Sequence, residues 1–308
     1  MQKSNARRCN VLSRRDMIVR TGVAAMGLGL SSLSAFGAGK PRRVLFFSKS
    51  AGFEHSVIQR ENGKPSYAEK ILTELGPKHG IEFEFSKDGS KFAPAYLDAF
   101  DAFVFYTTGD LTTAGTDKEP PMSSAGKRDL LEAIHRGKGF VGVHSATDTF
   151  HSPETGSRSQ YQNNGAQTDP YIQMIGGEFI IHDRQQKATQ HVVDSTFPGM
   201  PEHDFALEEE WYSFKNFAPD LHVLLVQETA GMTGKPYQRP PYPATWARRH
   251  GQGRVFYTSM GHREDVWTNP LFEQVLFGGI DWACGSVPAE VPQNGEQSAP
   301  GRNLLPPR

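Results

Sequence analysis

The sequence predicts an α/β protein built on a doubly wound, mostly parallel sheet. Short apolar runs that do not alternate with polar residues, such as RVLFFS at 43–48, are typical of strands buried on both faces. Segments whose apolar residues recur at helical spacing lie between these runs. Because strands that alternate with helices form a parallel sheet covered on both faces, the order of the segments indicates this fold class.

The first half of the chain supplies this alternation. After the strand at 43–48 comes a glycine-containing loop, and then an amphipathic helix at 66–79 that Gly76 and Pro77 bring to an end. The other predicted elements of this half are strands at 81–86, 102–107 and 139–144, and a helix at 123–136. We expect these strands to form a parallel sheet.

The second half is predicted to add further strands. They are expected at 188–193, 205–212, 223–227, 244–248 and 254–259, and a helix at 270–284 closes the domain. The polar stretch at 152–168 is too long for a simple connection, which predicts a loop over the site or a mobile insertion. Residues 286–308 are rich in proline and polar residues with almost no apolar content, so we expect a disordered tail.

The first 38 residues resemble a twin-arginine export signal. SRRDMI at 13–18 follows a polar, basic start, and an apolar run rich in glycine and alanine follows at 23–33. The run is short for a hydrocarbon core about 30 Å thick, and the small residues after it suit cleavage near Gly37 or Ala38. We therefore expect a periplasmic or secreted protein without stable membrane insertion. An uncleaved N-terminal anchor is the alternative.

Composition and charge exclude several classes of protein. With 37% hydrophobic and 22% charged positions among 308 residues, the chain is not disordered throughout. Lys and Arg number 33 against 34 Asp and Glu, and no basic stripe interleaves with aromatics, which argues against a nucleic-acid partner. Loss of the signal removes six basic residues and one acidic residue and leaves 27 against 33. Only Cys284 then remains, so no intrachain disulfide can form.

Four histidines lie at or near the ends of predicted strands, beside glycines. In open α/β sheets, ligands collect beyond the carboxyl ends of the strands. If His55, His144 and His262 converge there, they could hold one divalent metal, zinc or similar, with His182 as a fourth candidate. Glu264 could orient the ring of His262. The alternative is that each histidine is an ordinary packing or surface residue at a tight turn.

An acidic run followed by aromatics, EEEWY at 208–212, is the other notable cluster. Such a run is usually a solvated face. The functional alternative is sugar recognition, in which a ring covers the C–H face of the sugar and a carboxylate accepts hydroxyl protons. Alternation in a strand would place Glu210 and Tyr212 on one side. Asp148 lies just past the turn at 142–146 and could line the same crevice.

Six segments, taken in order, resemble the trehalose-utilisation (ThuA-like) family. They are GFEH at 52–55, FVFYTTGDL at 103–111, GKGFVGVHSATD at 137–148, YIQMIGGEFIIH at 171–182, EEEWY at 208–212 and TWARRHGQGRVFYTSMGHREDVW at 245–267. The resemblance runs from about 43 to 285, so the chain divides into a signal at 1–38, a ThuA-like domain at 39–285 and a tail at 286–308. One departure is Glu54, where many members carry a basic residue.

The resemblance implies a flavodoxin-like fold of the class I glutamine amidotransferase type, with extra strands in the second half. In those enzymes a GxCxG elbow between strand and helix presents a nucleophilic cysteine. The matching segment here is GVHSA at 142–146, so His144 stands where the cysteine would be. Glutamine hydrolysis through a thioester is therefore not expected.

The resemblance also implies a role in the catabolism of sugars or keto-glycosides. Proton abstraction beside a carbonyl would suit a histidine base and a metal, whereas a two-carboxylate glycosidase has less support because no acidic pair occupies the elbow. We expect a small carbohydrate as the partner and no nucleotide cofactor. The rival interpretation is a non-catalytic sugar-binding or accessory protein. The predicted catalytic residues are His144, His262 and Glu264; the predicted substrate contacts are His55, Asp148, Glu210 and Tyr212; the predicted metal ligands are His55, His144, His262 and His182.

Overall fold

The computed structural model describes residues 40–153 and 159–308, so the predicted signal at 1–38 and part of the polar stretch at 152–168 lie outside the described residues. Lys40–Arg308 group as one unit. No helix within the described ranges combines the length and the apolar character needed to cross a bilayer.

A nine-stranded sheet forms the centre of the fold, in the order β2-β1-β3-β4-β11-β10-β9-β6-β7, and β5 pairs with β8 in a separate two-stranded sheet. The strands are β1 (Arg42–Phe47), β2 (Ile81–Ser86), β3 (Ala102–Phe105), β4 (Gly139–Val143), β5 (Glu178–Ile181), β6 (Gln186–Val192), β7 (Phe205–Glu209), β8 (Ser213–Lys215), β9 (His222–Gln227), β10 (Tyr242–His250) and β11 (Gly253–Thr258).

The sheet has a parallel core and an antiparallel extension. The pairings from β2 through β1, β3 and β4 to β11 are parallel, whereas β11, β10, β9, β6 and β7 pair antiparallel. The α/β class and the parallel core are thus confirmed, and most of the extra strands of the second half extend the same sheet. Neither β5 nor β8 was predicted, because each is too short to show a pattern in sequence.

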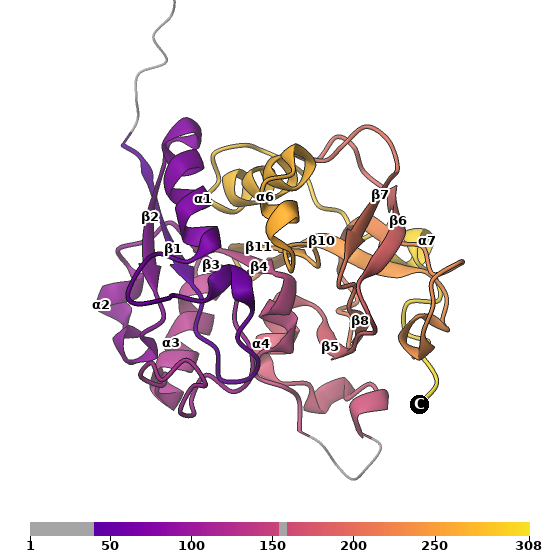
Figure 1. The fold of residues 1–308 in the computed structure, drawn as a ribbon, viewed down its shortest axis with the longest axis horizontal. Helices are drawn as coiled ribbons and strands as arrows, with labels where there is room; N and C mark the ends of the chain where they lie inside the picture. The colour runs from indigo at the N-terminus through magenta and orange to yellow at the C-terminus, as the bar shows by residue number, and fades with distance from the viewer. Residues whose placement is uncertain (1–39, 154–158) are drawn as a thin grey trace, which may run out of the picture. The chain divides into compact units, whose positions relative to one another are not determined.

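Helices cover both faces of the parallel core (Figure 1). They are α1 (Tyr67–Leu75), α2 (Pro94–Leu97), α3 (Ser124–His135), α4 (Pro170–Ile175), α5 (Glu264–Trp267), α6 (Pro270–Ala283) and α7 (Gly295–Ser298). Successive residues of β1 alternate between the two hydrophobic clusters: Val44 and Phe46 pack with α1 and α6, and Leu45 and Phe47 pack with α3 and α4. Burial on both faces explains why β1 shows no polar alternation.

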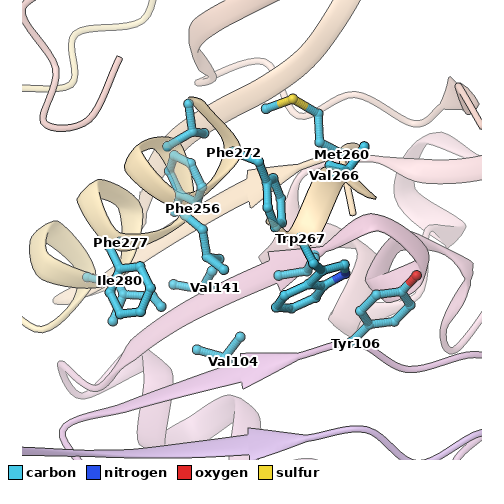
Figure 2. Packing of buried hydrophobic residues seen from close by; sticks show 14 of the residues in the cluster. Val104, Tyr106, Val141, Phe256, Met260, Val266, Trp267, Phe272, Phe277 and Ile280 are labelled. Atoms are coloured by element: carbon cyan, nitrogen blue, oxygen red, sulfur yellow. The ribbon is translucent and has the colours of Figure 1, made fainter. Parts of the chain in front are cut away.

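The closing helix α6 lies across the centre of the sheet. Phe272, Phe277 and Ile280 pack over Val141 of β4 and Phe256 of β11, as Figure 2 shows. All five side chains are buried, and each contributes about 1.5–3 kcal/mol through removal of apolar surface from water. The cluster fixes β4 and β11 side by side, and the segments that follow both strands carry candidate site residues.

The predicted disordered tail at 286–308 is instead ordered against the body of the protein. It contains α7, and the side chains of Ala299 and Arg302 are buried. Arg239 donates to the carbonyl oxygen of Arg302, and Arg302 donates to Glu296 at 2.6 Å. The prediction of disorder is therefore wrong. The composition shows that the tail has few apolar residues, but it does not show which groups its polar side chains bind in the folded protein.

We expect Asn294→Ala to lower the free energy of unfolding by about 2 kcal/mol. The Asn294 side chain accepts from the backbone N–H of Val223 at 2.6 Å and donates to its C=O at 3.1 Å. Val223 is buried, so the variant leaves a donor and an acceptor unpaired, at about 1–3 kcal/mol for each such group. Urea unfolding measures the loss, with Gln297→Ala on the exposed side of α7 as control. Equal stabilities of the two variants would contradict the prediction.

Candidate metal centre

Three of the predicted histidines lie at the carboxyl ends of strands of the parallel core. His55 follows β1, His144 follows β4, and His262 follows β11. Parallel strands end at the same edge of the sheet, so loops far apart in sequence meet there. The structure brings these three residues together, with ring centroids 5.0–5.2 Å apart.

His144 sits in a strained turn between β4 and a short helix of the 3-10 type at His144–Asp148. Its φ of 45° lies in the left-handed region, which a residue with a side chain rarely adopts. The Tyr257 hydroxyl donates to the His144 carbonyl at 2.7 Å and helps to hold the turn. The elbow implied by the family resemblance is thus present, with an imidazole at the position of the nucleophile.

Glu210 joins the three histidines. One ligand atom from each of His55, His144, Glu210 and His262 lies within 4.8 Å of all the others. Glu210 Oε2 is 3.0 Å from His262 Nδ1 and 3.5 Å from His144 Nε2. Glu210 was predicted as a substrate contact; it lines the cavity beside the site, and the structure also groups it with three of the candidate metal ligands.

The tautomer of His144 follows from its environment. Its Nδ1 lies 2.9 Å from the Ser259 carbonyl oxygen, which can only accept, so Nδ1 carries the proton. In the neutral ring, Nε2 then directs a lone pair toward the Glu210 carboxylate. His55 Nδ1, His144 Nε2 and His262 Nδ1 are buried and make no hydrogen bond of good geometry, although Glu210 Oε2 lies 3.0 Å from His262 Nδ1 and 3.5 Å from His144 Nε2. Buried polar atoms normally have partners, so these three nitrogens fit the coordination of a cation.

The pKa shifts of the group agree with this arrangement. Burial, with the neighbouring His144 and His262, lowers the pKa of His55 to about 2, so its ring stays neutral near pH 7. Burial alone would raise the pKa of Glu210, but contacts with His144 and His262 hold it well below its usual range. Burial alone would likewise lower the pKa of His262, and Glu210 raises it instead. The ionised carboxylate and the neutral ring of His55 are in the form that binds a metal, whereas the raised pKa of His262 means that a cation would have to displace a proton from its ring.

The three acidic residues of the EEEWY segment have three different environments. Glu208 is exposed and lies 3.6 Å from Arg263, and Glu210 enters the site. Glu209 is fully buried and accepts from the backbone N–H groups of Gly261 at 2.8 Å, His262 at 3.1 Å and Glu210 at 2.8 Å. β7 ends at Glu209 rather than at residue 212, so strand alternation does not explain the placement of Glu210.

The loop that carries His262 is also held by hydrogen bonds to the carbonyl oxygen of Gly261. The Trp267 indole donates to the Gly261 carbonyl at 2.7 Å, and the Tyr106 hydroxyl donates to the same oxygen at 3.1 Å. Figure 2 shows Tyr106 and Trp267 side by side, next to Phe272. Gly261 has a φ of 118°, a conformation that favours glycine. The position of His262 is therefore set by buried contacts on both sides of its loop.

A cavity of about 180 Å³ opens beside the candidate ligand atoms. It is lined by Phe53, His55, Asp148, Phe179, His182, Glu210, Tyr212 and His262. The Phe53 side chain is 68% exposed, whereas Tyr212 is buried and lies 4.2 Å from the His144 ring, centroid to centroid. The cavity thus combines aromatic walls with carboxylate and imidazole groups.

The remaining predicted residues lie around this centre. His182 Nδ1 is 3.3 Å from Glu210 Oε1, but the residue is outside the four-residue group and its Nδ1 also lies 3.0 Å from the Asp183 carbonyl oxygen. Glu264 accepts from the Ser56 hydroxyl, so it links the loops of His55 and His262 and does not enter the group. The catalytic roles predicted for His144, His262 and Glu264 stay predictions.

Sequence reasoning gave no role to Glu209, His151 or Glu178. Glu209 lies in an acidic run, which is usually a solvated face, and nothing in the sequence distinguishes it as the buried glutamate. His151 lies next to the predicted polar stretch, and Glu178 lies in the quoted GGEF segment without a periodic pattern. The contacts of Glu209 with Gly261 and His262, and of His151 with Glu178, join segments that are distant in sequence, so a single sequence carries no signal for them.

Comparisons with known proteins agree with the fold and the motifs. A putative ThuA-like protein from Bacteroides uniformis has a TM-score of 0.55 at 16% identity, covering 79% of this chain and 91% of that chain. A second from Parabacteroides merdae has a TM-score of 0.53 at 15% identity, covering 87% and 97%. No curated protein matches the sequence. The family model for trehalose utilisation, ThuA, matches residues 43–283. The chain therefore belongs to the ThuA trehalose-utilisation family.

Proposed function

We propose that this protein is a metal-dependent enzyme that acts on a sugar of the trehalose or keto-glycoside type. The observation that carries the proposal is the set of three buried ring nitrogens, none with a hydrogen bond of good geometry, that surround the ionised Glu210 carboxylate. Without a cation, the lone pair of His144 Nε2 faces a carboxylate oxygen at 3.5 Å. One divalent ion would satisfy all four groups.

Three imidazoles and one carboxylate suit zinc or a similar first-row ion. The ligands would be His55, His144, His262 and Glu210. A bound ion would supply Lewis acidity toward a carbonyl or hydroxyl oxygen in the adjoining cavity. Of the predicted ligands, His182 is left to contact substrate, because it lines the cavity outside the four-residue group.

The cavity supports a carbohydrate as the ligand. Aromatic faces and polar groups that accept hydroxyl protons together recognise sugars, and both are present. The volume of about 180 Å³ is below the range of about 300–1,000 Å³ for drug-sized ligands. We infer that the cavity takes one sugar ring and that any second ring lies outside it, near the exposed Phe53.

Metal analysis of untagged, full-length protein tests the proposal. We expect about one divalent ion per chain by plasma mass spectrometry, and loss of that ion on treatment with a chelator. Calorimetry with trehalose and with methyl 3-keto-α-glucoside then reports sugar binding before and after chelation. Protein that holds no metal, takes up none from zinc solutions and still binds sugar would instead be a non-catalytic sugar-binding protein.

We expect Phe53→Ala to weaken sugar binding about tenfold, equivalent to about 1.4 kcal/mol, without changing the metal content. The Phe53 ring is mostly exposed, so its loss removes a stacking surface and little packing. Calorimetric titration with methyl 3-keto-α-glucoside measures the change. Leu304→Ala, at an exposed position of 62%, is the control. Unchanged affinity in Phe53→Ala would place the sugar elsewhere.

We also propose that the protein is exported by the twin-arginine route and acts in the periplasm or outside the cell. The SRRDMI motif and the short apolar run after it support this proposal. Fusion of residues 1–38 to a reporter that is active only after export tests it, with Arg14→Lys and Arg15→Lys together as the control. Export that survives the double change would contradict the proposed route.

A further inference from the structure

Three side chains form a hydrogen-bonded chain that runs from the cavity wall into the protein. Asp148 lines the cavity, and its Oδ1 lies 2.7 Å from His151 Nε2. His151 Nδ1 lies 3.1 Å from Oε1 of Glu178, which is buried. A carboxylate oxygen only accepts, so each contact requires a proton on the histidine nitrogen. His151 is therefore a doubly protonated cation between two carboxylates.

Glu178 is firmly held at the inner end of this chain. It accepts from the Ser152 hydroxyl, from the Ser152 backbone N–H at 3.1 Å and from the Asn216 side-chain amide at 2.7 Å. Lys215 Nζ is 3.5 Å away. Burial alone would raise the pKa of Glu178, but these contacts and His151 lower it to about 2. Glu178 is thus a fixed anion that anchors His151.

In the proposed metal centre the imidazoles of His55, His144 and His262 would coordinate the ion, so these rings could not act as bases. If His55, His144, His262 and Glu210 are ligands, the remaining titratable groups in the cavity wall are Asp148, His182 and the Tyr212 hydroxyl, and burial raises the pKa of Tyr212 far above its usual value. The His182 side chain is 41% exposed and bonds to the carbonyl of the next residue. Asp148 is held by His151, and no hydrogen bond among the described residues occupies its Oδ2.

We propose that Asp148 is the acid–base residue of this site, and that His151, anchored by Glu178, positions its carboxylate. This inference rests on the proposed function, which it deepens. With a keto-sugar in the cavity, the C–H bond beside the carbonyl breaks and its proton goes to Asp148. The electron pair of that bond forms the C=C bond of the enediolate, and the carbonyl π pair moves to oxygen. Return of a solvent-exchanged proton to the same carbon gives exchange with solvent. Return of the proton to the neighbouring carbon, while the hydroxyl proton of the first carbon passes to the former carbonyl oxygen, gives isomerisation.

The charge of His151 should make the activity and the stability of the protein depend on pH. Burial alone would lower the pKa of His151, but the hydrogen bonds that His151 donates to Asp148 and Glu178 raise it to about 9. The other charged groups that face this region are Lys215, which pairs with Glu178, and Asp110, Lys127 and Asp169, which line the neighbouring cavity with His151. Lys127 and Asp169 pair at 2.7 Å, so they largely cancel. Above pH 9 the neutral ring has one N–H and loses one of its two carboxylate partners.

The free energy of unfolding should depend on pH through the same titration of His151. The pKa of His151 is raised in the folded state above the ordinary value of 6.5, so its contribution is fully present below pH 6.5 and is lost as pH rises through about 9. We expect His151→Gln to remove this part of the pH dependence. Thermal unfolding between pH 6 and pH 10 compares the variant with wild type.

The activity test is deuterium exchange in methyl 3-keto-α-glucoside, followed by proton NMR in deuterium oxide with zinc-loaded, full-length protein. We expect Asp148→Asn to slow exchange by about 10²–10⁴-fold. His151→Gln should lower kcat about tenfold with little change in KM and abolish the fall in rate near pH 9. The matched control is His191→Gln, because His191 also lies between two carboxylates, Asp204 at 2.7 Å and Glu228 at 3.3 Å, away from the cavity.

A second readout needs neither metal nor activity. In chelator-treated protein, the ring protons of His151 should titrate near pH 9 in wild type and nearer 6.5 in Asp148→Asn. Titration of wild-type His151 near 6.5, or wild-type exchange rates in Asp148→Asn, would overturn the inference. Absence of exchange with the wild-type protein would overturn the proposed chemistry itself, and with it the role of Asp148.

Discussion

Replacing His144 with asparagine should lower the affinity for zinc by at least about 100-fold. Loss of a residue that only supports a metal ligand commonly costs 10–100-fold, and His144 Nε2 would be a ligand itself. Asparagine tolerates the left-handed backbone conformation at φ 45°, so the turn after β4 is retained. Competition with a fluorescent zinc chelator measures the affinity.

Two further variants make this result specific. Glu210→Gln should give a comparable loss, since it removes the only anionic oxygen of the group. His191→Asn should leave zinc affinity unchanged, because its partners Asp204 and Glu228 lie outside the group. Wild-type zinc affinity in both His144→Asn and Glu210→Gln would show that the four residues do not bind the metal.

Replacing Glu209 with alanine should lower the free energy of unfolding by about 3–6 kcal/mol. The variant leaves the backbone N–H groups of Gly261, His262 and Glu210 without their acceptor in the protein interior. Each such group costs about 1–3 kcal/mol, and partial relaxation keeps the total below the full sum. Urea unfolding measures the change, and zinc affinity should fall as well because both His262 and Glu210 lose their support.

The neighbouring glutamates provide the controls for Glu209. Glu208→Ala alters an exposed side chain, so we expect less than about 0.5 kcal/mol. Glu209→Gln keeps one acceptor oxygen and should lie between Glu208→Ala and Glu209→Ala. If Glu209→Ala were as stable as Glu208→Ala, the three hydrogen bonds would not hold the metal-site loops.

Local pattern was enough to predict most elements of the parallel core. The strand at 81–86 has the predicted bounds, and the helix predicted at 123–136 is observed as α3. The apolar residues of α3 recur at helical spacing, and those of the strand at 81–86 alternate with polar residues, so each element leaves a period in the sequence. The tail at 286–308 carries no such period, and its order depends on polar contacts with β9 and with Arg239.

The resemblance to the ThuA family implied the elbow at 142–146, and the sequence by itself determined the fold class and the histidines near the strand ends. These properties follow from residue type and from short-range periodicity. Only the tertiary structure decided which carboxylate joins the histidines. Glu208, Glu209 and Glu210 are chemically identical and adjacent, and they differ only in what the folded chain places beside each. The same holds for the contact between His151 and Glu178, because Asp148 and His151 are close in sequence but Glu178, in β5, lies 27 residues beyond His151.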